Sequence, residues 1–155
     1  MTRATARPRR PLRADEAPPL DTLEADRRRA RLAAAVVAGA FDMAPEVFFR
    51  ATRGAAAEAE ARQIWCLVWL RMGEDAGSAA SVARLGKAIG RDRATLQHAV
   101  RKMEAACEGS PDLHRMIDTL AEVGRTLDKV QAVTLSAVAD AITAAREDEL
   151  DGFEG

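Results

Sequence analysis

The sequence predicts an all-α protein: a compact helical domain with a helix-turn-helix, plus an extra C-terminal helix and a disordered N-terminal arm. Two observations favour helices over strands: apolar residues recur at spacings of three and four, and no run alternates with period two. A third concerns the core, because alanine supplies much of the 48% hydrophobic content while aromatic residues make up only 4%. Such a core requires closely packed helices. A chain of 155 residues suffices for one core of ordinary size and a small appendage.

We divide the chain into three parts. Residues 1–28 are expected to form the disordered arm, because prolines and arginines are interleaved there without a hydrophobic period. Residues 29–122 are expected to form the helix-turn-helix domain, and residues 123–155 a C-terminal helix with an acidic tail. A basic arm can contact nucleic acid or can serve solubility alone, and the sequence leaves both roles open.

The first half of the domain predicts three helices. One covers residues 27–40, and Pro45 is suited to the first position of a short second helix. A loop with two arginines follows, and then a longer helix over 57–72. Trp65 and Trp69 lie four residues apart in that helix, so they share one side of it and are expected in the core.

The second half of the domain contains the candidate helix-turn-helix. A short helix, capped by Ser78 or Ser81, is expected to end at Ile89 before a glycine. Asp92 then caps a helix over 93–108. The two helices bury apolar residues at helical spacing: Val82, Leu85 and Ile89 in the first, Leu96, Val100 and Met103 in the second.

Two further helices complete the chain. The run Gly109–Pro111 is a stop and restart signal, and a helix over 112–123 follows it. Gly124 is expected to end that helix and to separate it from a last helix over 125–149. The last helix has an apolar side, which either contacts another protein chain or folds back on the domain.

Charge is distributed unevenly along the chain, although the net charge is only −1. Residues 81–103 carry six basic residues and one acidic residue, whereas residues 121–155 carry three basic and eight acidic residues. The basic window is a candidate anion-binding face. Its six cations are Arg84, Lys87, Arg91, Arg93, Arg101 and Lys102.

The second helix of the pair exposes side chains suited to DNA. They are Arg93, Ala94, Gln97, His98 and Arg101, with Thr95 and Lys102 at the margins. Arginine fits the acceptors of guanine, glutamine fits adenine, and the methyl groups of threonine and alanine fit thymine. Arg101 and Lys102, further along the helix, suit phosphates, as do the free N–H groups at the helix start. The alternative is a solvated basic face without a ligand.

Residues 90–103 read G-R-D-R-A-T-L-Q-H-A-V-R-K-M. This run resembles the signature G-R-D-H-T-T-V-x-H-A-x-R-K-I of the C-terminal DNA-binding domain of the bacterial replication initiator DnaA. Around it, Val37–Arg53 is similar to the family's first helices and basic loop, and Ala61–Met72 to its P-R-Q-x-A-x-x-L helix. Leu113–Leu120 is similar to its terminal helix, so the likeness covers about residues 30–121.

The resemblance implies roles for individual residues. It implies contacts at or near major-groove bases for Arg91, Asp92, Thr95 and His98. It also implies contacts to the DNA backbone for Arg62, Gln63 and Lys102. Arg50 or Arg53 is implied to enter the minor groove of the DNA.

The sequence departs from the family in two ways. The family's His-Thr pair is Arg93-Ala94 here, and each changed base contact is typically worth about 1–3 kcal/mol, so we expect a different preferred target. The chain also lacks a G-x-x-x-x-G-K-[ST] phosphate loop, so no ATPase module and no nucleotide cofactor are expected. Initiation of replication by this chain alone is therefore not expected.

We therefore expect a sequence-specific double-stranded DNA-binding protein that regulates transcription or is linked to replication. The alternative is a protein–protein interaction module that keeps the fold and antagonises or modulates a DNA-binding partner. A homo-oligomer or a protein partner could bind through residues 125–149.

An enzyme is not expected, because His98 and His114 have no nucleophile at a recognisable spacing. Cys66 and Cys107 lie in apolar helical patterns and are expected as reduced core thiols. No metal, cofactor or membrane span is expected, and a location in the cytoplasm, associated with the nucleoid, follows from these expectations.

Overall fold

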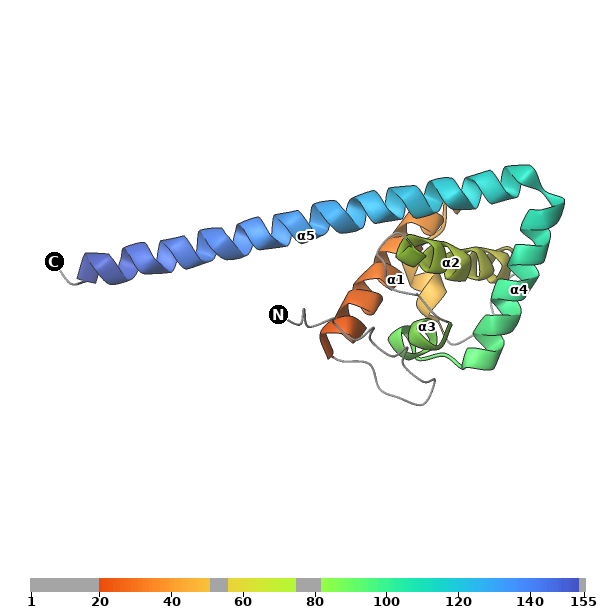
Figure 1. The fold of residues 1–155 in the computed structure, drawn as a ribbon, viewed down its shortest axis with the longest axis horizontal. Coiled ribbons are helices and arrows are strands. Elements are labelled where there is room, and N and C mark those ends of the chain that lie inside the picture. Colours follow the sequence, from red (N-terminus) through yellow and green to blue (C-terminus); the bar gives the residue numbers. More distant parts are fainter. Residues whose placement is uncertain (1–19, 51–55, 75–81, 154–155) are drawn as a thin grey trace, which may run out of the picture.

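The computed structural model describes residues 20–50, 56–74 and 82–153. These residues form α1 (Leu20–Phe41), the 3-10 helix η1 (Pro45–Phe49), α2 (Ala56–Glu74), α3 (Val82–Ile89), α4 (Arg93–Gly109) and α5 (Pro111–Phe153). No strand occurs within the described ranges, and the all-α prediction is confirmed. Figure 1 shows α1–α4 gathered beneath one half of α5, while the other half of α5 extends beyond them.

Helix α2 is the centre of the domain, because α1, α3, α4 and α5 all pack against it. Trp65 and Trp69 are buried on this helix, as the sequence predicts. Trp65 Nε1 donates to Ala30 O at 2.9 Å, and Trp69 Nε1 donates to Asp26 O at 3.1 Å, so both rings also tie α2 to α1. Small alanines on α1 let the two helices approach closely, which explains how so few aromatic residues can fill the core.

Helix α1 begins at Leu20, seven residues before the expected start at residue 27. The prediction that the disordered arm covers residues 1–28 is therefore wrong for residues 20–28, and its remainder lies outside the described residues. Asp26 explains the difference. Its side chain is fully buried and pairs with Arg84 of α3, which holds the first turns of α1 against the domain.

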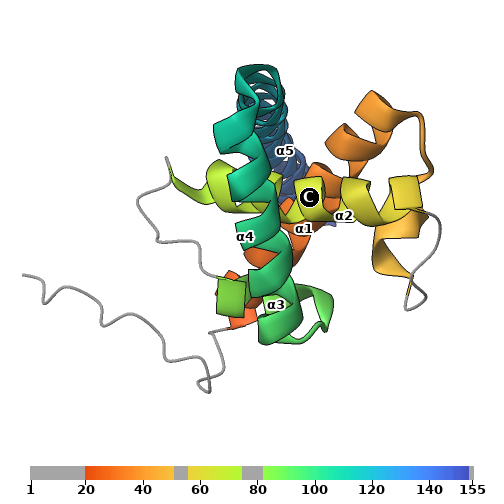
Figure 2. The same ribbon diagram turned by 90° about the vertical axis from the view of Figure 1, so that its right-hand side faces the viewer.

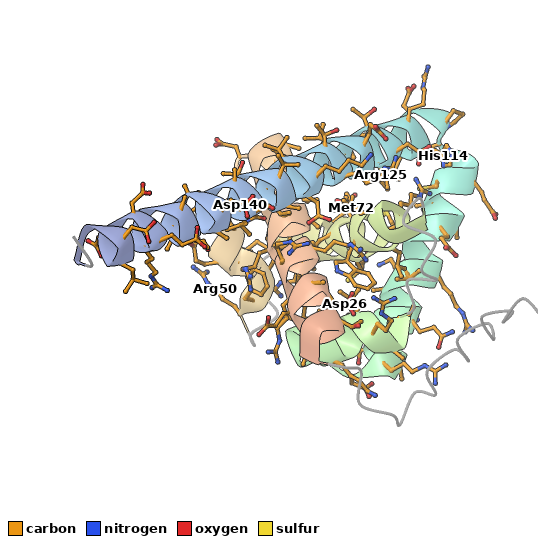
Figure 3. All side chains as sticks on the ribbon, turned by 60° about the vertical axis from the view of Figure 1, so that its left-hand side comes forward. Asp26, Arg50, Met72, His114, Arg125 and Asp140 are labelled. Atoms are coloured by element: carbon orange, nitrogen blue, oxygen red, sulfur yellow. The ribbon has the colours of Figure 1, made fainter. Side chains whose placement is uncertain are left out.

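The prediction of two separate C-terminal helices is wrong, because α5 runs without a break through Gly124. A glycine inside a helix costs only about 1 kcal/mol relative to alanine, which a continuous helix can absorb. Gly124 is needed for packing instead: a Cβ atom there would lie 2.6 Å from Met72 Sδ of α2. Figure 3 shows Met72 lying beneath α5. The expected boundary between the domain and a C-terminal unit at residue 123 thus falls inside one helix.

Helices α3 and α4 form the expected pair, joined by three residues. Gly90 adopts φ +68°, a conformation that glycine reaches without strain, and Arg91 N donates to Gly86 O at 3.0 Å to close the end of α3. Asp92 caps α4, as predicted. The expected caps Ser78 and Ser81 lie outside the described residues. That this pair acts as a DNA-binding helix-turn-helix stays a prediction.

The restart after α4 also follows the sequence signal. Ser110 Oγ accepts a hydrogen bond from Leu113 N at 3.3 Å, so it caps α5 just after the glycine that ends α4. Across the described ranges, none of the helices is apolar enough over a sufficient length to span a bilayer.

Candidate nucleic-acid interface

Helix α4 has one buried face and one open face. Its buried face consists of Leu96, Val100, Met103 and Cys107, at the spacings of three and four that the sequence predicts. Figure 2 shows α4 at the front of the domain, with α5 receding behind it. The exposed side chains of its first ten residues are Arg93, Ala94, Thr95, His98, Arg101 and Lys102, and Gln97 is partly exposed.

The cations on this open face have no counter-charge within the part of the chain that the structure describes. Within residues 20–50, 56–74 and 82–153, Arg93, Arg101 and Lys102 make no hydrogen bond or ion pair. The acidic end of α5 could have covered them, but it projects away from α4 (Figure 1). Glu104 and Glu108 are exposed further along α4, so the positive potential is confined to the first half of the helix.

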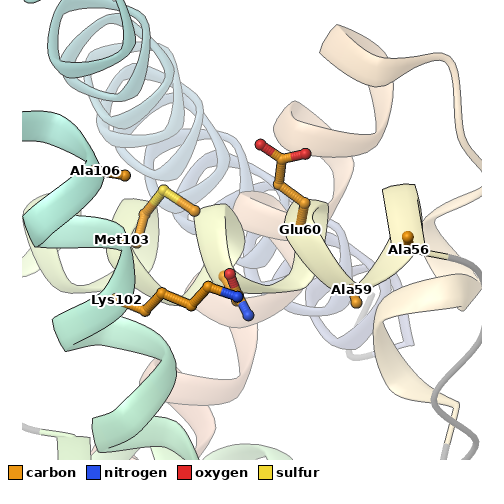
Figure 4. Close-up of a pocket in the computed structure, with 7 residues that line it drawn as sticks. Ala56, Ala59, Glu60, Lys102, Met103 and Ala106 are labelled. Atoms are coloured by element: carbon orange, nitrogen blue, oxygen red, sulfur yellow. The ribbon is translucent and has the colours of Figure 1, made fainter. Parts of the chain in front are cut away.

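Lys102 and Gln63, two of the predicted contacts to the DNA backbone, line the same groove between α4 and α2. The groove has a volume of about 560 Å³ and is lined by Ala56, Ala59, Glu60, Gln63, Lys102, Met103 and Ala106. In Figure 4 the Lys102 side chain extends from α4 toward α2. An ammonium group and an amide in one groove suit a phosphate oxygen, although the Glu60 carboxylate at the other side opposes an anion.

Asp92 and Thr95 are engaged with each other at the start of α4. Asp92 Oδ2 accepts from Thr95 N at 3.1 Å and from Thr95 Oγ1 at 3.3 Å. The carboxylate therefore satisfies an otherwise free N–H of the first turn. A contact of Asp92 near the DNA bases, as predicted, would compete with this capping role, whereas Thr95 remains exposed.

A second cluster of arginines lies at the C-terminal end of η1. Arg91 Nη2 donates to Phe48 O at 3.1 Å and to Arg50 O at 2.7 Å. Arg62 is buried and donates to Val47 O through Nε at 3.1 Å and Nη2 at 2.8 Å. Burial lowers the pKa of Arg62, and the nearby charge of Arg91 lowers it further. Arg91 and Arg62 thus fix the backbone that leads to Arg50.

Arg50 itself is exposed at the edge of this cluster. Arg53, the predicted alternative to Arg50 for minor-groove entry, lies outside the described residues. The hydrogen bond from Arg91 to Arg50 O therefore brings these two predicted residues together.

Arg84 faces the interior of the domain. Arg84 Nη2 lies 2.6 Å from Asp26 Oδ1 and Arg84 Nε donates to Asp26 Oδ2 at 3.0 Å, which joins α3 to α1. Arg29 Nη1 lies 3.9 Å from the same carboxylate, and the Arg29 guanidinium lies 5.5 Å from the Trp69 ring centre. Lys87, partly buried on α3, also has an interaction partner.

The sequence did not single out Asp26, although it is the buried counter-ion of two arginines. No local signal could have found it, because its partner Arg84 lies 58 residues away. Both predicted core thiols are buried and free. Among the residues placed by the structure, no group of three or more metal-binding side chains is gathered.

Comparison with family models finds no match, and comparisons with curated proteins and with solved structures find none either. The candidate interface therefore rests on its own geometry and charge.

Proposed function

We propose that the chain is a sequence-specific double-stranded DNA-binding protein that reads the major groove with the first half of α4. One observation carries the proposal: Arg93, Arg101 and Lys102 are exposed, without partners among the described residues, on the open face of a helix whose other face is buried. The major groove of B-DNA is about 12 Å wide and admits one α-helix. A rigidly packed helix with uncompensated cations on its outer face fits that groove.

The residues divide by role. Arg93, Gln97 and His98 present hydrogen-bonding groups for base edges, and the methyl groups of Ala94 and Thr95 suit thymine. Arg101, and Lys102 with Gln63 in the groove beside α2, suit phosphates. Arg50, which is exposed, extends the DNA-binding surface and would contact the DNA backbone or the minor groove.

Three of the predicted contact residues act mainly as supports. Arg62, Arg84 and Arg91 donate to backbone carbonyls or to Asp26, and they hold the helices that carry the contacts. A regulator of transcription or a factor linked to replication is the role we propose for such a reader. The resemblance of residues 90–103 to the DnaA signature supports this class, and the Arg93-Ala94 departure predicts a different target.

Affinity selection from random duplexes, followed by salt titration of the full chain, tests the proposal. A DNA reader is expected to enrich a defined site and to lose affinity with salt at a slope of about −0.9 per phosphate contacted. Lys102→Ala should weaken every duplex alike and reduce the slope by about one, whereas Arg93→Ala should cost about 1–3 kcal/mol on the selected site only.

Arg115→Ala is the matched control, because it removes an exposed arginine that lies outside α4. It should leave affinity within twofold on all duplexes. Equal losses on every duplex for Arg93→Ala would count against base reading, and the absence of binding at low salt would overturn the proposal.

The second candidate, a module that modulates a DNA-binding partner, is favoured by one observation: exposed apolar residues along the far half of α5. If the affinity selection enriches no duplex, this second candidate function is the one that remains.

A further inference from the structure

A second groove lies where α1, η1 and α3 meet. It has a volume of about 290 Å³, and we call it the Phe49 groove. The residues that line it are Arg27, Ala30, Arg31, Phe49, Ala88 and Ile89. Helix α1 packs against both α3 and η1, and in Figure 3 Arg50 marks the end of η1 beside α1. None of these lining residues belongs to α4, so the groove is separate from the helix that we propose reads DNA.

The groove offers an apolar surface that the fold leaves uncovered. Phe49 is 47% exposed, whereas its neighbour Phe48 is fully buried. Within the described parts of α1–α4 and η1, Phe49 is the one large apolar side chain that stays exposed. Its ring packs edge-on against Trp65, with the ring centres 5.2 Å apart. An aromatic side chain that is already held in place can bury a partner's side chain at a small cost in conformational entropy.

Two arginines make the groove positive. Arg27 and Arg31 are exposed and lie four residues apart on α1, and neither makes a hydrogen bond or ion pair with any residue that the structure describes. Like charges at this spacing destabilise a helix, and an anionic partner would remove that repulsion. Asp26, next to Arg27 in the sequence, is buried and pairs with Arg84 instead. Glu24 is exposed on α1 and forms no ion pair with either groove arginine.

We propose that the Phe49 groove binds an acidic segment of another protein, which inserts one large apolar side chain. That side chain would contact Phe49 and Ile89, and carboxylates on either side of it would pair with Arg27 and Arg31. A volume of about 290 Å³ is at the small end of ligand sites, so it suits side chains of an extended segment rather than a folded domain.

Other anionic occupants fit the groove less well. A DNA backbone would pair with the arginines but would leave Phe49 and Ile89 without an apolar partner. The acidic end of α5 in the same molecule is directed away from α1–α4 (Figure 1). An acidic peptide with an apolar residue matches both the charge and the exposed apolar surface.

Selection from a library of random displayed peptides, with the full chain as the target, tests the proposal. The experiment does not depend on DNA binding, because no DNA is present. We expect the enriched peptides to share one large apolar residue flanked by aspartates or glutamates. The absence of any enriched pattern, or a pattern without acidic residues, would overturn the proposal.

Titration of the most enriched peptide, followed by fluorescence anisotropy, tests whether it binds this groove. Arg27→Ala combined with Arg31→Ala should weaken the peptide by at least about tenfold, because both charge-assisted pairs are lost. The matched control is Arg115→Ala combined with Arg146→Ala, which removes two exposed arginines of α5. It should weaken the peptide by less than about twofold. Equal weakening by the two double variants would overturn the proposal.

The apolar contact is tested separately. Phe49→Ala should weaken the peptide by about tenfold, because the apolar side chain of the peptide loses its aromatic partner. Leu135→Ala is the control, since Leu135 is 54% exposed on α5, and should leave the affinity within about twofold. Circular dichroism and urea unfolding verify that each variant keeps the fold. An unchanged affinity for Phe49→Ala would contradict an inserted apolar side chain.

Two further measurements separate the other occupants. If the Arg27 and Arg31 substitutions lower the affinity for duplex DNA while no acidic peptide is enriched, these arginines contact phosphates and the proposal is wrong. Sedimentation equilibrium of the full chain tests for a second copy. Self-association that the same substitutions abolish would identify a second copy as the occupant and would overturn the assignment to another protein.

Discussion

Arginines of similar sequence context have different roles in this protein. Arg93 and Arg101 are exposed on α4 and make no hydrogen bond or ion pair among the described residues. Arg84 and Arg62, which the sequence groups with them as candidate DNA contacts, are turned into the domain toward Asp26 and Val47. An arginine whose hydrogen bonds are already made within the fold has less to offer a phosphate, so charge in a sequence window overestimates the charge available to a ligand.

The Asp26 carboxylate should be a large single contributor to stability. Asp26→Ala is expected to lower the free energy of unfolding by about 3–5 kcal/mol, because it leaves the largely buried Arg84 and Arg29 guanidinium groups without their counter-ion. Urea unfolding followed by tryptophan fluorescence measures this change. Glu24→Ala, which removes an exposed acid two residues away on α1, should stay within about 0.5 kcal/mol of the parent. Equal losses for the two variants would contradict the role assigned to the Asp26 pair.

The Cys66 thiol should be unreactive in the folded protein. Burial raises its pKa to about 12, above its ordinary value, so the thiol stays protonated at neutral and mildly alkaline pH. Cys107 is also buried. With an aromatic disulfide reagent at pH 8 to 9, the native chain should react at least about 100-fold more slowly than the chain in urea, where two thiols should react. Rapid reaction of one native thiol would show that its helix opens readily.

At the scale of elements, α5 is fixed to α2 by packing and by polar contacts. Arg125 Nη1 donates to Arg71 O at 2.8 Å, and Arg71 Nη1 lies 2.9 Å from Asp118 Oδ1. Arg125 also pairs with Glu122, whose pKa is lowered by this hydrogen bond and charge. These contacts flank Gly124, and Figure 3 shows Arg125 and Met72 in the same region of the α2–α5 contact. A glycine at this point permits close approach of the two helices.

Gly124→Ala should therefore behave differently from Gly39→Ala. No atom lies within 4 Å of a Cβ placed at Gly39 in α1, so alanine there should stabilise the protein by about 0.5–1 kcal/mol. At Gly124 the Cβ meets the buried Met72 Sδ, and overpacking of about 1–3 kcal/mol should outweigh that gain. Urea midpoints measure both changes. Combined with Met72→Ala, the Gly124→Ala change should become stabilising; equal gains for both glycines in the parent would refute the packing role.

At the scale of the whole molecule, the chain consists of a packed domain and a protruding half-helix. The domain includes α1–α4 and the first half of α5, and the core is continuous across all of them. The acidic half of α5 lies outside that core, on the far side from α4. The separation lets the positive face of α4 and the negative end of α5 coexist in a chain of net charge −1 without neutralising each other.

A chain that ends at Lys129 should fold as stably as the full chain in dilute solution. Residues 130–152 are all exposed, so removal of the chain beyond Lys129 should change the free energy of unfolding by less than about 0.5 kcal/mol. Tryptophan fluorescence in urea, at protein concentrations below 1 µM, measures this. A clearly lower midpoint for the shortened chain would indicate that the far half of α5 folds back onto the domain, which the sequence left open.

The sequence by itself determined the elements whose ends carry local signals. Pro45 opens η1, Asp92 caps α4, and Gly109–Pro111 separates α4 from α5, because caps, glycine and proline act within a few residues of their position. The hydrophobic period of α4 likewise determined which of its faces is buried and which is open. These signals suffice to describe the exposed face of α4 as a candidate site.

Only the tertiary structure decided what depends on distant parts of the chain. Gly124 is a local stop signal, yet α5 continues through it because Met72, 52 positions earlier, occupies the space of its missing side chain. Arg84 is a surface cation by composition, yet it is turned inward because Asp26 of α1 is buried beside it. A local pattern predicts where a helix can begin or end. Whether it does so, and which charges stay exposed, depends on neighbouring residues that only folding brings together.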